Sequence, residues 1–168
     1  CSNLEFSKAV STYLALILSR HSSYNSSLCW WEPTGERGFN VFGRQALPMV
    51  FDYTEQNPFE SFTGNWKSQS EITLEIIEQL CELSSDNPVK VTQLSATQLT
   101  YPSSFFDAVL TDPPYYNSVP YADLSDFFYV WLNRTIGFLH PELFSTPLSP
   151  KDKEITEMAG WDSKRYSY

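Results

Sequence analysis

A short apolar segment that stops at two prolines is the feature that most constrains the fold of this chain. Residues 105–110 read Phe-Phe-Asp-Ala-Val-Leu, a pattern that is typical of a short buried β-strand. Residues 111–116 follow at once and read Thr-Asp-Pro-Pro-Tyr-Tyr. Because adjacent prolines stiffen the backbone, the polar groups of this loop are held in place at the mouth of the predicted strand.

The loop offers groups that suit a flat ring bearing an amino group. Asp112 is able to accept a hydrogen bond from an exocyclic N–H. The carbonyl of Pro113 is able to accept a second, and proline brings no competing N–H of its own. Tyr115 presents an aromatic face on which a base can stack. The sequence therefore indicates a binding loop for an aromatic amine.

Three helices are predicted around this loop. Apolar residues recur at helical spacing over residues 3–21. A second helix is expected over 69–84, with a capping box that begins at Ser68. A third is expected over 120–136, where a proline occupies the first turn and a glycine follows the end. The second helix is expected to bury an apolar stripe of Ile72, Ile76, Ile77, Leu80 and Leu83.

Strand patterns alternate with these helices. Residues 89–94 are rich in β-branched side chains and predict a strand, as do residues 105–110. Shorter strands are expected at 29–31 and 39–42. This order predicts the α/β class: part of a Rossmann-like sheet with flanking helices. The Asp112 loop would then lie at the carboxyl edge of the strands, where open α/β sheets bind ligands.

The charge of the chain argues against a complete DNA-binding protein. The net charge is −9, with 11 Lys and Arg against 20 Asp and Glu. DNA-binding proteins usually present a basic face to the phosphates. The few basic residues that cluster in the sequence lie near the C-terminus: Lys151, Lys153, Lys164 and Arg165. Either other parts of a larger protein bind DNA, or this segment does not bind DNA at all.

The cysteines and the hydropathy of the chain indicate its cellular setting. Cys1, Cys29 and Cys81 form no C-x-x-C pair, which argues against a zinc site within the chain and against a disulfide scaffold. No metal is therefore expected. Cys29 and Cys81 are candidates for ordinary core positions. The absence of a disulfide pattern is consistent with a reducing, cytoplasmic setting. No apolar run is long enough to span a membrane, and no signal peptide is visible, so no membrane partner is expected.

The tetrapeptide Asp112-Pro113-Pro114-Tyr115 resembles the D-P-P-Y motif of S-adenosylmethionine-dependent amino-methyltransferases. Those enzymes methylate the exocyclic amine of adenine or cytosine in DNA. The residues around the motif, 105–132, and a second stretch, 42–50, look like the large adenine-specific DNA methylases of bacteria and archaea. The resemblance runs from about Tyr13 to Lys153. It implies an S-adenosylmethionine-dependent enzyme that acts on N6 of adenine.

The resemblance also implies roles for individual residues. The catalytic set would be Asp112, Pro113, Pro114 and Tyr115. The substrate would be bound by Tyr115, Tyr116 and Arg44. The cofactor would lie near Ser95, Ala96 and Asp112. At Ser95 the chain departs from the family, which usually has the acidic residue of Gly-Asp-Ala there, and this weakens the assignment of the cofactor contacts.

A cofactor-binding turn is missing from the sequence. A methyltransferase of this kind needs a Gly-rich turn after its first strand, and none of the six glycines forms a G-x-G after a strand. In the family, that turn and a zinc ribbon lie N-terminal to the region corresponding to residue 1. Residues 1–168 are therefore expected to be a partial methyltransferase domain. Its expected partners are the remaining N-terminal part of the same enzyme and, through the full-length protein, DNA.

Two alternatives stay open. A related enzyme acting on N4 of cytosine in DNA or on N2 of guanine in transfer RNA is compatible with Asp112, whereas protein glutamine methyltransferases typically carry Asn first. The other alternative is a non-catalytic or degenerate methylase fragment. The missing Gly-rich turn, Ser95 and the net charge of −9 favour that alternative for the chain as it stands.

Overall fold

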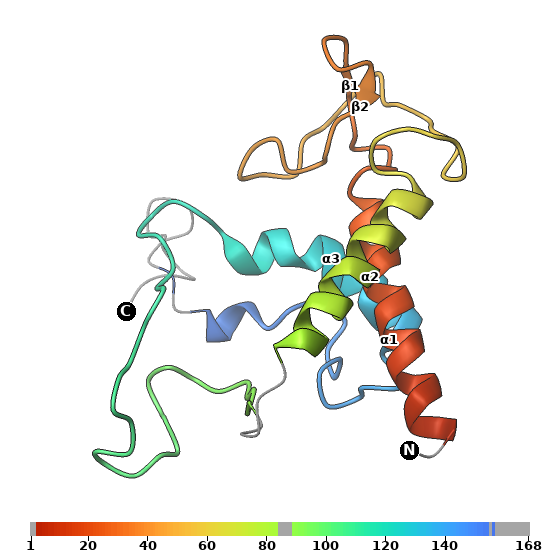
Figure 1. Cartoon of the computed structure of the whole chain (residues 1–168). Helices are drawn as coiled ribbons and strands as arrows, with labels where there is room; N and C mark the ends of the chain where they lie inside the picture. Colours follow the sequence, from red (N-terminus) through yellow and green to blue (C-terminus); the bar gives the residue numbers. More distant parts are fainter. Residues whose placement is uncertain (1–2, 84–88, 155, 157–168) are drawn as a thin grey trace.

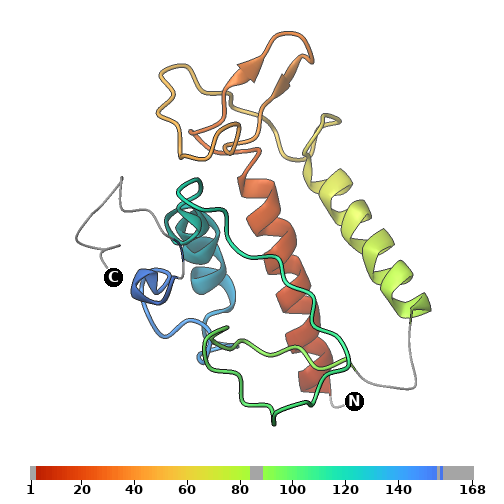
Figure 2. The same ribbon diagram turned by 90° about the vertical axis from the view of Figure 1, so that its left-hand side faces the viewer.

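The computed structural model describes residues 3–83, 89–154 and 156, and three helices dominate it (Figure 1). α1 lies between the other two, with α2 on one side and α3 on the other (Figure 2). A small two-stranded sheet stands beyond the C-terminal end of α1. The elements are α1 (Asn3–Ser22), β1 (Trp31–Glu32), β2 (Arg37–Gly38), α2 (Trp66–Glu82), α3 (Tyr121–Ile136) and η1 (Lys151–Lys153). This combination of helices with a small sheet is compatible with the α/β class.

None of the helices in the described part of the chain has the length and apolar content that crossing a bilayer requires.

Several buried residues lie where the C-terminal end of α1 meets the small sheet. Ile17, Cys29 and Val41 are buried there, and so is His21. The Nδ1 atom of His21 lies 2.9 Å from the carbonyl oxygen of Gly64, and its ring meets Trp66 edge-on. The predictions of a helix over 3–21 and of a core Cys29 are confirmed.

The small sheet differs from the strands expected at 29–31 and 39–42. β1 and β2 pair antiparallel, with Trp31 opposite Gly38 and Glu32 opposite Arg37. The pairing centres on residues 31–38 because a tight turn closes there, helped by a positive φ of 45° at Glu36. An ion pair of 2.8 Å between Arg37 Nε and Glu32 Oε2 spans the two strands. The expected strands were therefore placed a few residues too far from the turn.

The prediction for the start of α2 was wrong by about one turn. Asn65, not Ser68, is the N-cap, and its side-chain Oδ1 accepts a hydrogen bond from the Ser68 N–H at 2.7 Å. The expected burial of its apolar stripe was also wrong, since Ile72, Ile76, Leu80 and Leu83 are exposed. Cys81, expected in the core, is exposed as well. The reason is that, among the described elements, α2 packs mainly against α1.

The strands predicted at 89–94 and 105–110 do not form in the described chain. Residues 89–94 are coil, residues 105–110 are coil with a bend at Asp107, and both segments belong to a long loop that extends away from the helices (Figure 1). Their apolar side chains are exposed, Leu110 to 97%. A strand needs a neighbour to satisfy its backbone N–H and C=O groups, and no described segment pairs with either one.

Candidate functional site

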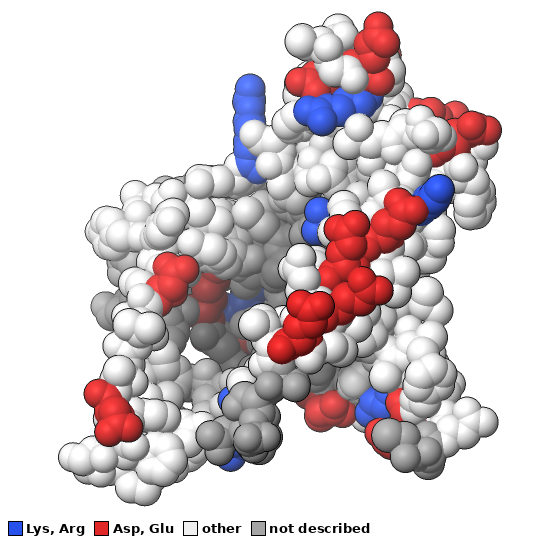
Figure 3. All heavy atoms as spheres, in the orientation of Figure 1, with Lys and Arg blue, Asp and Glu red and all other residues white. Residues whose placement is uncertain are grey.

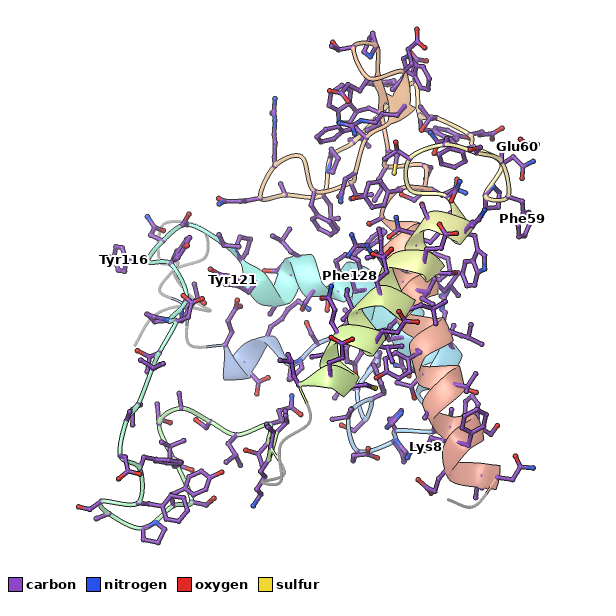
Figure 4. All side chains as sticks on the ribbon, viewed as in Figure 1. Lys8, Phe59, Glu60, Tyr116, Tyr121 and Phe128 are labelled. Carbon is purple, nitrogen blue, oxygen red and sulfur yellow. The ribbon has the colours of Figure 1, made fainter. Side chains whose placement is uncertain are left out.

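The residues of the D-P-P-Y motif lie together in one exposed loop that leads into α3. Asp112, Pro113 and Pro114 are exposed, and the side chains of Tyr115 and Tyr116 are 64% and 79% exposed. Figure 4 shows Tyr116 at the outer edge of the molecule, away from the three helices. The acceptors and the aromatic face that the sequence predicts are thus accessible from solvent in the described chain.

The C-terminal side of this loop is anchored to α3. The backbone N–H of Tyr115 donates to the hydroxyl oxygen of Tyr121, with 3.3 Å between nitrogen and oxygen. Tyr121 is the first residue of α3, so the helix fixes the position of its ring (Figure 4). Between them, Asn117 turns the chain with a positive φ of 48°, a conformation that Asn tolerates better than most residues. Tyr121 is therefore a positioning residue that the sequence did not single out.

A second contact brings the segment around Arg44 to the same loop. Phe42 stacks on Phe128, with ring centroids 5.2 Å apart. Ser118 Oγ donates to Gln45 Oε1 at 3.4 Å, so residues 42–45 lie beside the turn that follows the motif. Arg44 itself is exposed and has no described hydrogen bond or ion pair. The structure thus brings the neighbours of Arg44 to the loop and leaves its guanidinium in solvent.

The two expected cofactor residues of the 95–97 region are not joined to the motif. Ser95 makes a local turn in which its Oγ atom lies 2.8 Å from Thr97 Oγ1 and its carbonyl accepts from the Gln98 N–H at 3.1 Å. Ser95 and Ala96 are exposed, and no described contact links them to Asp112. These three residues do not form a cradle for S-adenosylmethionine in the described chain.

The helix that follows the motif is held by the segment C-terminal to it. Asp126 accepts hydrogen bonds from the Ser149 N–H at 2.9 Å and from the Ser149 Oγ at 2.6 Å, and it also forms an ion pair with Lys151. Burial tends to raise the pKa of Asp126. The hydrogen bonds from Lys151 and Ser149, together with the charge of Lys151, outweigh burial, so the pKa is lowered. Residues 146–154, which we call the strap, therefore bind α3 through an ionised Asp126.

The strap also caps the N-terminus of α3. Pro120 is the N-cap and supplies no side-chain acceptor. The Ala122 N–H donates instead to Glu154 Oε1 at 2.9 Å, and a carboxylate at this end also opposes the positive pole of the helix. The hydroxyl of Tyr129 donates to the Thr146 carbonyl at 2.7 Å. The contacts of Asp126 with the strap span more than twenty residues, and local sequence patterns do not indicate them.

Metal-binding clusters and surface hollows were the other candidate sites in the described chain. Within the described ranges, no group of three or more His, Cys, Asp and Glu residues is placed to hold a metal ion. A hollow of about 460 Å³ lies at the N-terminus of α2, and another of about 410 Å³ lies beside β2 and Phe42. Neither is lined by a residue of the motif loop.

Comparisons with protein-family models, with curated proteins and with solved structures find no match for this chain.

Proposed function

We propose that this chain is the amine-binding part of an S-adenosylmethionine-dependent DNA methyltransferase that acts on N6 of adenine. One observation carries the proposal. The carboxylate of Asp112 and the ring of Tyr115 are exposed in the same loop, and that loop is anchored to α3 through the Tyr121 hydroxyl. An anchored loop with free acceptors and a free aromatic face suits the capture of an extruded base.

Each residue of the loop has a role in this proposal. The target base leaves the duplex stack at a cost of a few kcal/mol. Asp112 and the carbonyl of Pro113 accept the two hydrogen bonds of its amino group, which draws the nitrogen lone pair out of ring conjugation. Pro114 keeps these acceptors in place, and Tyr115 stacks on the base, with Tyr116 beside it. Arg44 reaches the substrate from the neighbouring segment.

The methyl group would come from S-adenosylmethionine, held in the complete protein. Ser95, Ala96 and Asp112 are too exposed and too poorly connected in the described chain to bind it alone. We assign the main cofactor contacts, and the basic surface that a chain of net charge −9 lacks, to the remaining N-terminal part of the same enzyme. Residues 89–94 and 105–110 would complete a Rossmann-like sheet with that part. Their strand-like composition and exposed apolar side chains, Val91 and Leu110 among them, support this assignment. The cytoplasm is the expected setting.

A second candidate is a non-catalytic subdomain that serves assembly. The net charge of −9, the absence of a cofactor cradle from the described residues and the exposed apolar segments favour it. Cytosine N4 and guanine N2 in RNA are the alternative target amines for an active enzyme, since Asp112 is able to accept from each of them.

The decisive experiment compares Asp112→Ala with Asp107→Ala in the full-length protein. Asp107 is a second exposed carboxylate of the same long loop with no described partner, so it controls for a simple loss of charge. Incorporation of labelled methyl groups into DNA and transfer RNA is measured, and the modified nucleoside is identified after digestion. We expect N6-methyladenine in DNA from the wild type and the Asp107 variant, and none from the Asp112 variant.

The other outcomes separate the alternatives. Methylcytosine or methylguanine as the product would replace the proposed target amine. An Asp112 variant as active as the wild type would show that Asp112 is not the acceptor. No methylation of any substrate by the wild type would favour the assembly role.

A further inference from the structure

The hollow beside β2 has aromatic walls. Its volume of about 410 Å³ lies within the range of about 300–1,000 Å³ that is usual for small-molecule sites. Its lining residues come from the segment after α1, from β2 and the residues that follow β2, and from Thr63. The aromatic side chains among them are those of Tyr24, Phe39 and Phe42. Such walls favour a flat ring as the occupant, because a ring can stack on them or meet them edge-on.

Each of the three rings is held in place by packing against another part of the fold. The Tyr24 ring lies against Gly64, where an added Cβ atom would come within 2.8 Å of the Tyr24 Cγ atom. Gly64 also has a φ of 88°, so both its backbone and this close approach suit glycine. Phe39 packs against Trp30 with ring centroids 5.0 Å apart, and Phe42 stacks on α3. The walls are therefore formed before a ligand arrives, which lowers the entropic cost of binding.

Two polar side chains that line the hollow have free hydrogen-bond donors. The Oδ1 atom of Asn40 accepts from the Phe42 N–H at 2.7 Å, and because its partner is a donor, the facing atom must be the amide oxygen. The Nδ2 group of Asn40 has no hydrogen-bond partner among the described residues. Arg37 donates to Glu32 through Nε, and its terminal nitrogens have no described partner. The hollow thus combines hydrogen-bond donors with aromatic faces.

We propose that this hollow binds a nucleobase, with guanine preferred over adenine. The rings supply the stacking surface, and the donors of Asn40 and Arg37 suit an edge that carries two adjacent acceptors. O6 and N7 of guanine form such an edge, whereas adenine pairs its N7 acceptor with an amino donor. Asn recognises adenine by also accepting from that amino group, but the Asn40 oxygen is already held by Phe42. This preference differs from the adenine proposed for the motif loop, and it does not depend on methyl transfer.

The distribution of charge is compatible with a nucleotide at this end of the molecule. Figure 3 shows basic and acidic side chains side by side over the small sheet, whereas a continuous acidic ridge follows α2: Glu71, Glu75, Glu78 and Glu82. The two cations of residues 21–66 are Arg37, which lines the hollow, and Arg44, which follows the lining residue Gly43. A phosphate attached to the bound base is therefore better tolerated beside the sheet than beside α2.

The test titrates the 168-residue chain with guanosine monophosphate, adenosine monophosphate and ribose 5-phosphate. NMR shifts of the Phe42 and Gly43 amides report binding, since Phe42 donates to Asn40 and Gly43 lines the hollow. We expect saturable shifts with guanosine monophosphate, binding about tenfold weaker with adenosine monophosphate, and no shifts with ribose 5-phosphate, which lacks a base. A single-stranded oligonucleotide that contains one guanine then separates the sources of the base. Tighter binding than the mononucleotide identifies nucleic acid as the ligand, and equal or weaker binding identifies a free nucleotide.

A pair of matched variants locates the contact. Asn40→Asp removes the Nδ2 donor but keeps an oxygen that accepts from the Phe42 N–H. Asn57→Asp is the control, because Asn57 accepts from the Phe59 N–H at 3.1 Å in the same local pattern, is exposed and does not line the hollow. Both variants add one negative charge, and circular dichroism verifies their fold. We expect Asn40→Asp to weaken binding of guanosine monophosphate about tenfold or more, and Asn57→Asp to change it by less than about twofold.

Several results would overturn the proposal. One is the absence of amide shifts with guanosine monophosphate, and another is equal binding of ribose 5-phosphate, which would show that only the phosphate is bound. Adenosine monophosphate that binds as tightly as guanosine monophosphate would refute the assigned base edge. Equal binding by Asn40→Asp and Asn57→Asp would show that Asn40 is not a contact of the base.

Discussion

Asp126 provides the sharpest test of how the strap holds the helix that follows the D-P-P-Y motif. The substitution Asp126→Asn keeps the size of the side chain and one oxygen acceptor but removes the charge. In the native protein the carboxylate accepts two hydrogen bonds from Ser149 and one from Lys151. The side chains of Asp126 and Lys151 are only 18% and 27% exposed, so solvent screens this pair less than a typical surface pair.

The expected loss follows from these contacts. A hydrogen bond to a charged group contributes about 1.5–3 kcal/mol, and the three contacts act as one unit, so we expect a total within about that range. Because the strap is a surface segment, the loss should appear as local opening rather than as global unfolding. Hydrogen exchange of the Ser149 amide, which donates to Asp126, is the direct measure. We expect its protection to fall roughly tenfold to a hundredfold, at about 1.4 kcal/mol per decade.

The effect of pH on this contact has a defined sign. The folded pKa of Asp126 lies below its ordinary value of 3.8, so the strap is stabilised above that value. The stabilisation is lost as pH falls from 3.8 through the lowered pKa, and the difference between wild type and Asp126→Asn should shrink over that interval. Asp152→Asn, on the exposed side of the strap, is the control. Unchanged protection of Ser149 in Asp126→Asn, or an equal loss in Asp152→Asn, would refute the assignment.

Three further predictions concern the loop, the cofactor and α2. In the full-length protein, Tyr115→Phe should retain methyl transfer and Tyr115→Ala should lose it about ten- to hundredfold, because stacking on a base contributes roughly 1–3 kcal/mol. Melting curves of both variants should match the wild type, since Tyr115 is exposed; a lower melting point would make it a packing residue. The isolated chain should bind S-adenosylmethionine weakly or not at all, and a micromolar constant by calorimetry would contradict this. Asn65→Ala should destabilise α2 by about 0.5–2 kcal/mol, and more than Ser68→Ala, in thermal melts followed by circular dichroism.

Local signals in the sequence predicted the helices well. The apolar spacing of residues 3–21 and the proline and glycine that bracket 120–136 place α1 and α3 within a residue of their observed bounds. The expected start of α2 rested on the capping-box pattern at Ser68, whereas Asn65, three residues earlier, is equally suited to cap a helix and does so. Such signals act over a few residues and therefore do not depend on the rest of the fold.

Contacts between distant residues were the part that sequence could not predict. The position of the motif loop before α3 followed from the sequence, but the contact of Ser118 with Gln45 spans 73 residues, and Asp126 meets Ser149 across 23. The strand predictions failed for a related reason. Composition indicates that residues 105–110 are suited to a β-strand. A strand forms only when a neighbouring strand pairs with it, and the described chain contains no such neighbour for this segment.

The two sides of the Asp112 loop therefore differ in how firmly they are held. Tyr121 and Gln45 anchor its C-terminal side, whereas residues 105–110 on its N-terminal side have no pairing partner among the described residues. Pairing of that segment with a strand of another part of the protein would fix Asp112, two residues beyond Leu110, from both sides. Because one end is already anchored, such pairing would order only a short remaining stretch, which limits its entropic cost. Completion of the sheet and positioning of the Asp112 carboxylate would then be the same event.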